Sequence, residues 1–264
     1  MKEKREKSET SKNSDKAPAV LLCGHGSRSP QAAAEFHHLV EKLQRRLAGQ
    51  TVSGGFLEFN RPTIAHGLRD LYDRGHRDMI VQPLTLYNAG HTRRDIPDIL
   101  QDFRRDHPDA RLRYGAALGL SPPVIDAAVQ AIRSVLPDGD PEDFKLLVVG
   151  RGSPERAVAD QTINLCRKLH QRLDFGDSRY CYSFGGAPLL AKGLRHAARS
   201  HYHQVVVLPV LLFSGRLLSD IYREIDRASA EYPAFTFHKA PHLGAQEAII
   251  DAISDAIRQT DKSG

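Results

Sequence analysis

The chain is poor in cysteine and has no long apolar run. Its three cysteines, Cys23, Cys166 and Cys181, are odd in number and widely spaced, so they form neither a disulfide framework nor a CxxC metal motif. No segment approaches the roughly 18 consecutive apolar residues that a membrane span needs, and the N-terminus has no apolar signal-peptide core. The sequence therefore predicts a protein of the reducing cytoplasm that does not enter a membrane.

The chain also has little excess charge of either sign. The formal net charge of its 264 residues is +5, of which the lysine- and glutamate-rich segment 1–17 contributes +2. This segment is too polar to bury a core and is predicted to be a disordered tail. The small balance on the remaining residues does not favour nucleic acid as a partner, but it is compatible with an anionic small molecule.

What the sequence does contain is a long internal repeat. "GHGS" at 24–27 returns as "GRGS" at 150–153, and residues 62–87 align at the same offset, without a gap, on residues 188–213. Matching over nearly a whole half indicates a duplicated domain, and two copies are too few for a solenoid.

The repeat sets the predicted domain boundaries. We expect an N-terminal domain at 18–136 and a C-terminal domain at 144–264, joined by the proline- and glycine-containing segment 136–143. Towards the end of each repeat the offset falls by one residue, which places His91 opposite Arg216. Only the N-terminal domain is therefore expected to carry catalytic histidines.

Each repeat alternates short apolar runs with helical patterns. Such alternation is typical of an α/β fold in which a small parallel sheet has helices on both faces. The second repeat begins the same series at Lys145. In the first repeat we expect strands at 19–23, 52–57, 79–82 and 112–114, and helices at 30–47, 62–73, 95–105 and 123–135.

Three polar side chains follow three strands of the first repeat. His25 comes after the first strand, Glu58 at the end of the second and His91 after the third. Ligands of open α/β sheets bind beyond the carboxyl ends of the strands, so we expect these side chains to converge on one rim. Imidazole binds borderline metals such as cobalt, nickel, zinc or iron, and it accepts protons near neutral pH.

A structural interpretation of the same residues is also open. A glycine-rich loop between a strand and a helix is often only a tight turn or an anion-binding loop. For Glu58, the structural interpretation is a surface charge that flanks a helix. The convergence of three such side chains favours a functional site over these readings.

Three stretches then point to a family. "GHGSRSPQAAAEF", "FLEFNRPTI" and "PLTLYNAGHTRRDIP" resemble the signatures of the CbiX-type sirohydrochlorin cobaltochelatases, which are class II chelatases. The duplicated chain with histidines in one half resembles the long form of that family, from about Ala19 to the C-terminus. The resemblance implies two chelatase-like domains that face each other across a cleft. It also implies insertion of Co(II), as substrate metal and without an organic cofactor, into sirohydrochlorin during cobalamin synthesis.

The resemblance further implies residue roles. His25 matches a proton acceptor and metal ligand, and His91 matches a second metal ligand. His25, Glu58 and His91 are thus the expected catalytic residues. Arg151 and Arg216 replace the two histidines in the second repeat, so a second metal site is not expected there. The positions that match tetrapyrrole contacts are Glu58, Leu86, Tyr87, Asn88, Ala89 and Gly90.

Metal insertion explains why these residue types are needed. A base must remove two pyrrole N–H protons, and imidazole is suited to this near neutral pH. A weak two-histidine site releases its metal more readily than a closed four-cysteine site.

The substrate carries carboxylates, which guanidinium groups bind through paired hydrogen bonds. We expect Arg151 to bind substrate, although a solvated or helix-capping arginine is the alternative. Further candidates are Arg28, Arg93, Arg94 and Arg216.

Three alternatives remain open at this stage. The same pocket also suits an iron or nickel chelatase, because the ligands alone do not set metal selectivity. The second alternative is a non-catalytic protein that carries a tetrapyrrole or a metal. A phosphate-binding enzyme is the weakest alternative, because the chain lacks the GxxxxGK[ST] and GxGxxG fingerprints. The choice between sirohydrochlorin and precorrin-2 is open, as is the oligomeric state, with a monomer compatible with the sequence.

Overall fold

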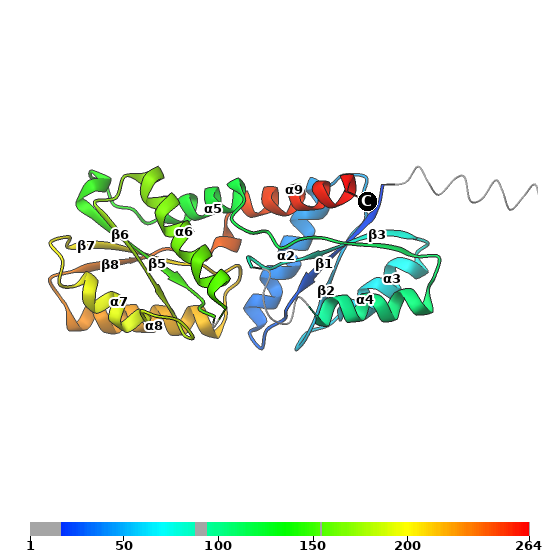
Figure 1. Cartoon of the computed structure of the whole chain (residues 1–264), viewed down its shortest axis with the longest axis horizontal. Coiled ribbons are helices and arrows are strands. Elements are labelled where there is room, and N and C mark those ends of the chain that lie inside the picture. The colour runs from blue at the N-terminus through cyan, green and yellow to red at the C-terminus, as the bar shows by residue number, and fades with distance from the viewer. Residues whose placement is uncertain (1–16, 88–93, 154, 264) are drawn as a thin grey trace, which may run out of the picture.

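The computed structural model describes residues 17–87, 94–153 and 155–263, which form two similar α/β units side by side (Figure 1). All strand pairs are parallel, in the order β2-β1-β3-β4 in the first sheet and β6-β5-β7-β8 in the second. The predicted fold class is therefore confirmed. The strands are β1 (Ala19–Gly24), β2 (Val52–Phe56), β3 (Asp78–Pro83), β4 (Arg111–Tyr114), β5 (Phe144–Gly150), β6 (Asp177–Tyr182), β7 (Gln204–Pro209) and β8 (Thr236–Lys239).

The helices expected in the first repeat are present, each with a counterpart in the second. The helix predicted from residue 62 begins at Ile64, because Thr63 caps it by accepting a hydrogen bond from the His66 N–H at 3.3 Å. The helices are α2 (Pro30–Arg46), α3 (Ile64–Asp73), α4 (Asp95–Asp106), α5 (Pro122–Arg133), α6 (Arg156–Leu173), α7 (Leu190–Ala197), α8 (Arg216–Glu231) and α9 (Ala248–Lys262), with 3₁₀ turns η2 (Pro141–Asp143) and η3 (Leu243–Ala245).

Strand β1 is buried along its whole length, which explains its continuous apolar sequence. Its side chains alternate between two apolar clusters. Val20 and Leu22 belong to the cluster that includes side chains of α2 and α9, while Leu21 and Cys23 belong to the cluster under α3 and α4. The sheet is thus covered by helices on both faces.

The last helix of each repeat packs on the other unit. Helix α9, from the second repeat, lies against α2, β3 and β4 of the first, whereas α5 lies against α6 and β7 of the second (Figure 1). Arg46 on α2 pairs with Asp251 on α9, and Arg172 on α6 pairs with Asp126 on α5. The segment 136–143 therefore divides the repeats in the sequence, while in space each unit includes one helix of the other repeat.

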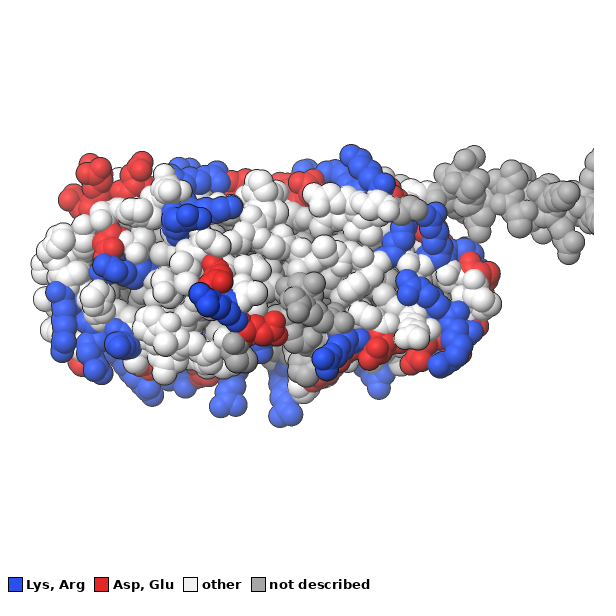
Figure 2. Space-filling view, in the orientation of Figure 1, with Lys and Arg blue, Asp and Glu red and all other residues white. Residues whose placement is uncertain are grey.

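The face of the molecule in Figure 2 has no simple electrostatic signal. Basic and acidic side chains are interspersed on the face that Figure 2 shows. Within the part of the chain that the structure describes, no helix has both the length and the apolar character that crossing a bilayer requires. The predicted tail at 1–17 lies outside the described residues, except for Ala17.

Candidate functional site

The loop that follows β1 is fixed to the end of β2. Gly26 adopts a φ of 93°, and a Cβ atom there would lie 1.9 Å from the carbonyl oxygen of Glu58, so glycine is required. The Glu58 N–H donates to the His25 carbonyl oxygen at 3.0 Å. His25 and Glu58 are therefore backbone neighbours at the carboxyl edge of the first sheet, and both side chains are exposed.

The second repeat builds the same loop with different side chains. Gly152 has a φ of 92°, and a Cβ atom on it would lie 1.6 Å from the Phe184 carbonyl oxygen. The Phe184 N–H donates to the Arg151 carbonyl oxygen at 3.2 Å. Arg151 thus stands at the position that His25 occupies in the first repeat, and Phe184 at that of Glu58.

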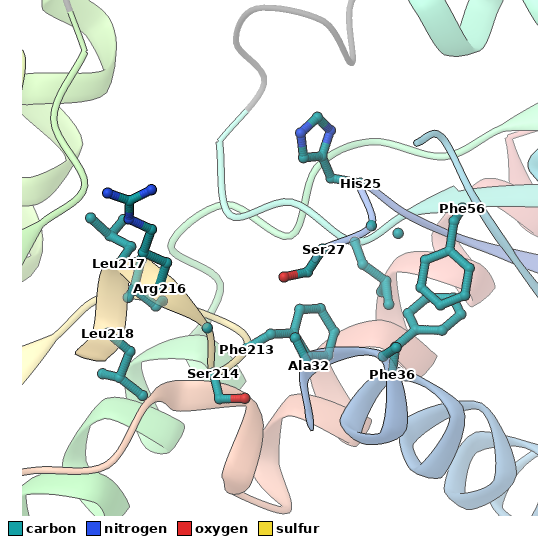
Figure 3. A pocket seen from close by; sticks show the side chains of 16 residues that line it. His25, Ser27, Ala32, Phe36, Phe56, Phe213, Ser214, Arg216, Leu217 and Leu218 are labelled. Carbon is teal, nitrogen blue, oxygen red and sulfur yellow. The ribbon is translucent and has the colours of Figure 1, made fainter. Parts of the chain in front are cut away.

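A cavity of about 320 Å³ opens between the two units beside His25 (Figure 3). One wall is the end of β1 with the start of α2. The other is the segment from Leu211 to Leu218, which joins β7 to α8 in the second repeat. Figure 3 shows His25 and Arg216 on opposite sides of the cavity, with Ser27 and Phe213 between them and both side chains pointing toward the top of the view. An imidazole and a guanidinium from different repeats thus serve one pocket.

The loops after β3 and β7 cross between the units reciprocally. Phe213 in the second repeat packs against Phe36 on α2, with ring centroids 6.2 Å apart. At the 126-residue offset, Tyr87 corresponds to Phe213 and Thr162 corresponds to Phe36. The Tyr87 hydroxyl is buried beside Thr162 on α6. Each repeat therefore supplies a loop to the other repeat's edge.

The predicted tetrapyrrole-contacting stretch begins inside this interface. Leu86 is buried in the shared apolar core, and Tyr87 packs against that core. Burial raises the pKa of the Tyr87 phenol. The remaining predicted residues of the stretch, together with His91 and Arg93, lie outside the described residues: Asn88, Ala89, Gly90, His91 and Arg93.

Arginine side chains gather around the carboxyl edges of both sheets. The Arg28 guanidinium lies 5.3 Å from the ring centre of Phe59, and that of Arg151 lies 5.5 Å from the ring centre of Phe184. The Arg216 side chain is 95% exposed and lies 3.7 Å from Asp220. Arg94 precedes helix α4. These arginines thus belong to segments that follow strands, and Arg216 among them lines the cavity together with His25.

The described residues supply one of the two predicted metal ligands, His25. No group of three or more His, Cys, Asp or Glu side chains suited to a metal ion occurs within 17–87, 94–153 and 155–263. An exposed imidazole in a cavity that Arg216 also lines can accept a proton or bind a metal weakly, while a guanidinium holds an acidic ligand.

Of the segment from Leu211 to Leu218, the sequence identified Arg216 as a candidate but not the residues before it. Ser214 lines the pocket, and its hydroxyl is buried without a hydrogen-bond partner in the described part of the chain. Its backbone N–H donates to the Glu35 carboxylate on α2 at 2.8 Å. The repeat offset aligned Phe213 with Tyr87, but no sequence signal showed that either loop crosses to the opposite unit.

Comparisons with known proteins agree with this architecture. A family model described as CbiX matches residues 19–135 and again 145–260. The sirohydrochlorin ferrochelatase of Priestia megaterium is 31% identical over 247 residues, covering 94% of this chain and 92% of that protein. The sirohydrochlorin cobaltochelatase of the same organism is 24% identical over 233 residues, covering 86% and 74% respectively. A structure of SirB from Bacillus subtilis with Fe3+ superposes with a TM-score of 0.82 at 24% identity, covering 92% of this chain and 95% of that one.

Proposed function

The chain belongs to the CbiX family, and from that premise we propose that it is an enzyme that inserts a divalent metal ion into sirohydrochlorin. The observation that carries the proposal is the pocket between the units, which is lined by His25 of one repeat and Arg216 of the other. Full-length similarity to proteins named sirohydrochlorin chelatases supports the same substrate.

In the proposed reaction, His25 accepts a proton from a pyrrole nitrogen and passes the metal to the macrocycle. Its exposed imidazole lies at the mouth of the cavity. The hydrogen bond from the Glu58 N–H holds its backbone, so the ring is presented from a fixed loop. We propose that His91 is the second ligand and that the Glu58 carboxylate attracts the incoming cation and receives protons from His25.

Arginines bind and orient the acidic macrocycle in this proposal. Arg151 takes the position of His25 in the second repeat, and Arg216 stands across the cavity from His25. Guanidinium is permanently charged and has no free lone pair, so neither arginine can replace imidazole as metal ligand or base. We therefore assign one metal-handling site to each chain. We keep as proposed contacts of the macrocycle the residues Leu86, Tyr87, Asn88, Ala89 and Gly90.

Two metals are candidates. The sequence predicted Co(II), and similarity to a cobaltochelatase supports it. Similarity to a ferrochelatase, at 31% identity over most of both chains, favours Fe(II) as the second candidate. Imidazole binds both ions, so the residues of the pocket do not decide between them. We place the reaction in the cytoplasm, because Cys23, Cys166 and Cys181 are free thiols.

The test is an anaerobic absorbance assay of the purified protein with sirohydrochlorin and Co(II), Fe(II) or Ni(II). We expect metal insertion faster than the spontaneous reaction with at least one of the first two ions. Binding of sirohydrochlorin and metal without any increase in rate would identify a carrier instead. The ratio of kcat/KM values for the metals then identifies the preferred ion.

A further inference from the structure

Phe59 is an exposed aromatic residue beside His25. It follows Glu58 at the carboxyl edge of the first sheet and is 56% exposed, one of four large apolar side chains exposed in the described part of the chain. Its ring meets the His25 ring edge to face, with centroids 6.4 Å apart. A side chain in this position contributes little to the core, so its packing does not explain its presence.

The backbone at Phe59 also argues against a structural role. Its φ is 63°, in the left-handed region that bulky side chains rarely adopt. The corresponding residue of the second repeat is Gly185, with a φ of 60°. The turn therefore needs a left-handed residue in both repeats, and glycine provides it without strain. The first repeat retains a phenyl ring there at a conformational cost that the fold does not require.

Arg28 adds a positive charge beside the Phe59 ring. Its guanidinium lies 5.3 Å from the centre of the Phe59 ring, in a cation–π arrangement. Arg28 and His25 both belong to the loop after β1, so an imidazole, an aromatic ring and a fixed positive charge are adjacent at the mouth of the cavity. A planar ligand with carboxylates around its edge matches this combination, because aromatic rings stack on flat faces and guanidinium binds carboxylates.

We propose that Phe59 is a substrate-binding residue that stacks on the tetrapyrrole while Arg28 binds one of its peripheral carboxylates. This inference rests on the proposed function; it adds Phe59 as a contact and pairs it with Arg28, already a candidate from the sequence. The macrocycle takes the face of the Phe59 ring that Arg28 leaves open. The pair thereby holds the pyrrole nitrogens within reach of His25.

The informative variant is Phe59→Gly, because it removes the ring and relieves the left-handed backbone together. We expect the KM for sirohydrochlorin to rise about 5-fold or more, the loss that one aromatic contact of about 1 kcal/mol represents. The value of kcat should change little, since the contact is made in both ground and transition states. The Tm should stay the same or rise, which a merely structural residue would not allow.

Further variants separate the ring from other effects. Phe59→Tyr should keep the wild-type KM, and Phe59→Leu should not, since leucine lacks a flat face. Arg28→Ala should also raise the KM, and this increase should shrink at high ionic strength because the contact is between charges. The increase caused by Phe59→Gly should persist at high ionic strength. Ile163→Ala, at an exposed apolar residue of α6, is the control and should leave KM unchanged.

The outcomes distinguish this inference from the proposed function. A wild-type protein that inserts no metal refutes the function itself. An active wild type whose KM is unchanged by Phe59→Gly refutes the role of Phe59 alone. A wild-type KM in the Phe59→Leu variant would show that any apolar side chain serves and that no flat ring is needed. That result would also overturn the proposal. If Phe59→Gly lowered the Tm as well as raising the KM, the ring would have a structural role instead.

Discussion

The carboxylate of Glu35, on helix α2 of the first repeat, accepts a hydrogen bond from the backbone N–H of Ser214 in the second repeat at 2.8 Å. The imidazole of His242 lies 3.5 Å from the same carboxylate. Ser214 precedes Gly215, whose φ of 137° turns the chain into α8, and Arg216 is the first residue of that helix. Glu35 thus fixes the loop that brings Arg216 to the pocket of His25.

Loss of this link should weaken the fold. Glu35→Ala removes the acceptor of a partly buried N–H, so we expect the free energy of unfolding to fall by about 1–3 kcal/mol. Urea unfolding monitored by circular dichroism measures it. Glu41→Ala, at an exposed carboxylate on the same helix, is the control and should change stability by less than about 0.5 kcal/mol. Equal effects of the two variants would show that the link contributes nothing.

His25→Ala should nearly abolish metal insertion without unfolding the protein. Removal of a general base typically lowers the rate by about 10²–10⁴-fold. Isothermal titration with Co(II), before and after the substitution, should show a site that is lost, and His91→Ala should weaken it as well. Insertion at the wild-type rate by a folded His25→Ala protein contradicts the assignment. So does a metal site that survives loss of both histidines.

Glu58→Gln should slow turnover and leave the fold intact. The amide can neither accept a proton nor attract a divalent cation as a carboxylate does. The backbone N–H of residue 58, which fixes His25, is retained, so the Tm should not change. Steady-state rates across titrations of metal and of sirohydrochlorin provide the measurement. Wild-type kinetics in both titrations would reduce Glu58 to a surface charge.

Arg151→Ala should weaken sirohydrochlorin binding while Co(II) binding stays intact. Arg151 supplies a fixed positive charge above the Phe184 ring and no metal-binding lone pair. Raised ionic strength should shrink the difference from wild type, because exposed charges are screened. Arg167→Ala, at an exposed arginine of α6 hydrogen-bonded to Asn164, serves as the matched control. An unchanged dissociation constant for sirohydrochlorin would leave Arg151 a solvated side chain.

Arg216 offers a test of whether the second repeat completes the site of the first. We expect Arg216→Ala to raise the KM for sirohydrochlorin, and Arg216→Lys to restore it only in part, because lysine lacks the planar fork that pairs with a carboxylate. Metal affinity should not move in either variant. A fall in metal affinity with substrate binding intact would contradict a role in binding the macrocycle.

The sequence by itself determined the local architecture. The apolar run 19–23 predicted the strand observed at Ala19–Gly24, and the helical spacing over 62–73 predicted the helix observed at Ile64–Asp73, because burial follows a period of residues that is visible in the sequence. The repeat predicted two similar α/β units, and the parallel-sheet rule placed His25 and Glu58 at one edge, where their backbones meet. The resemblance of three short motifs then indicated the family that full-length comparison identified.

Only the tertiary structure decided how the units complete each other. The packing of α9 on the first unit, and the crossing of the loop that bears Arg216, depend on contacts between residues more than 100 positions apart, as between Glu35 and Ser214. The packing of α5 on the second unit is also a contact between the two repeats. Nothing in local periodicity encodes such contacts. The left-handed φ of Phe59 was equally invisible, because phenylalanine ordinarily avoids it and the surrounding fold imposes it. A duplicated sequence specifies two sheets, whereas packing between them makes the pocket.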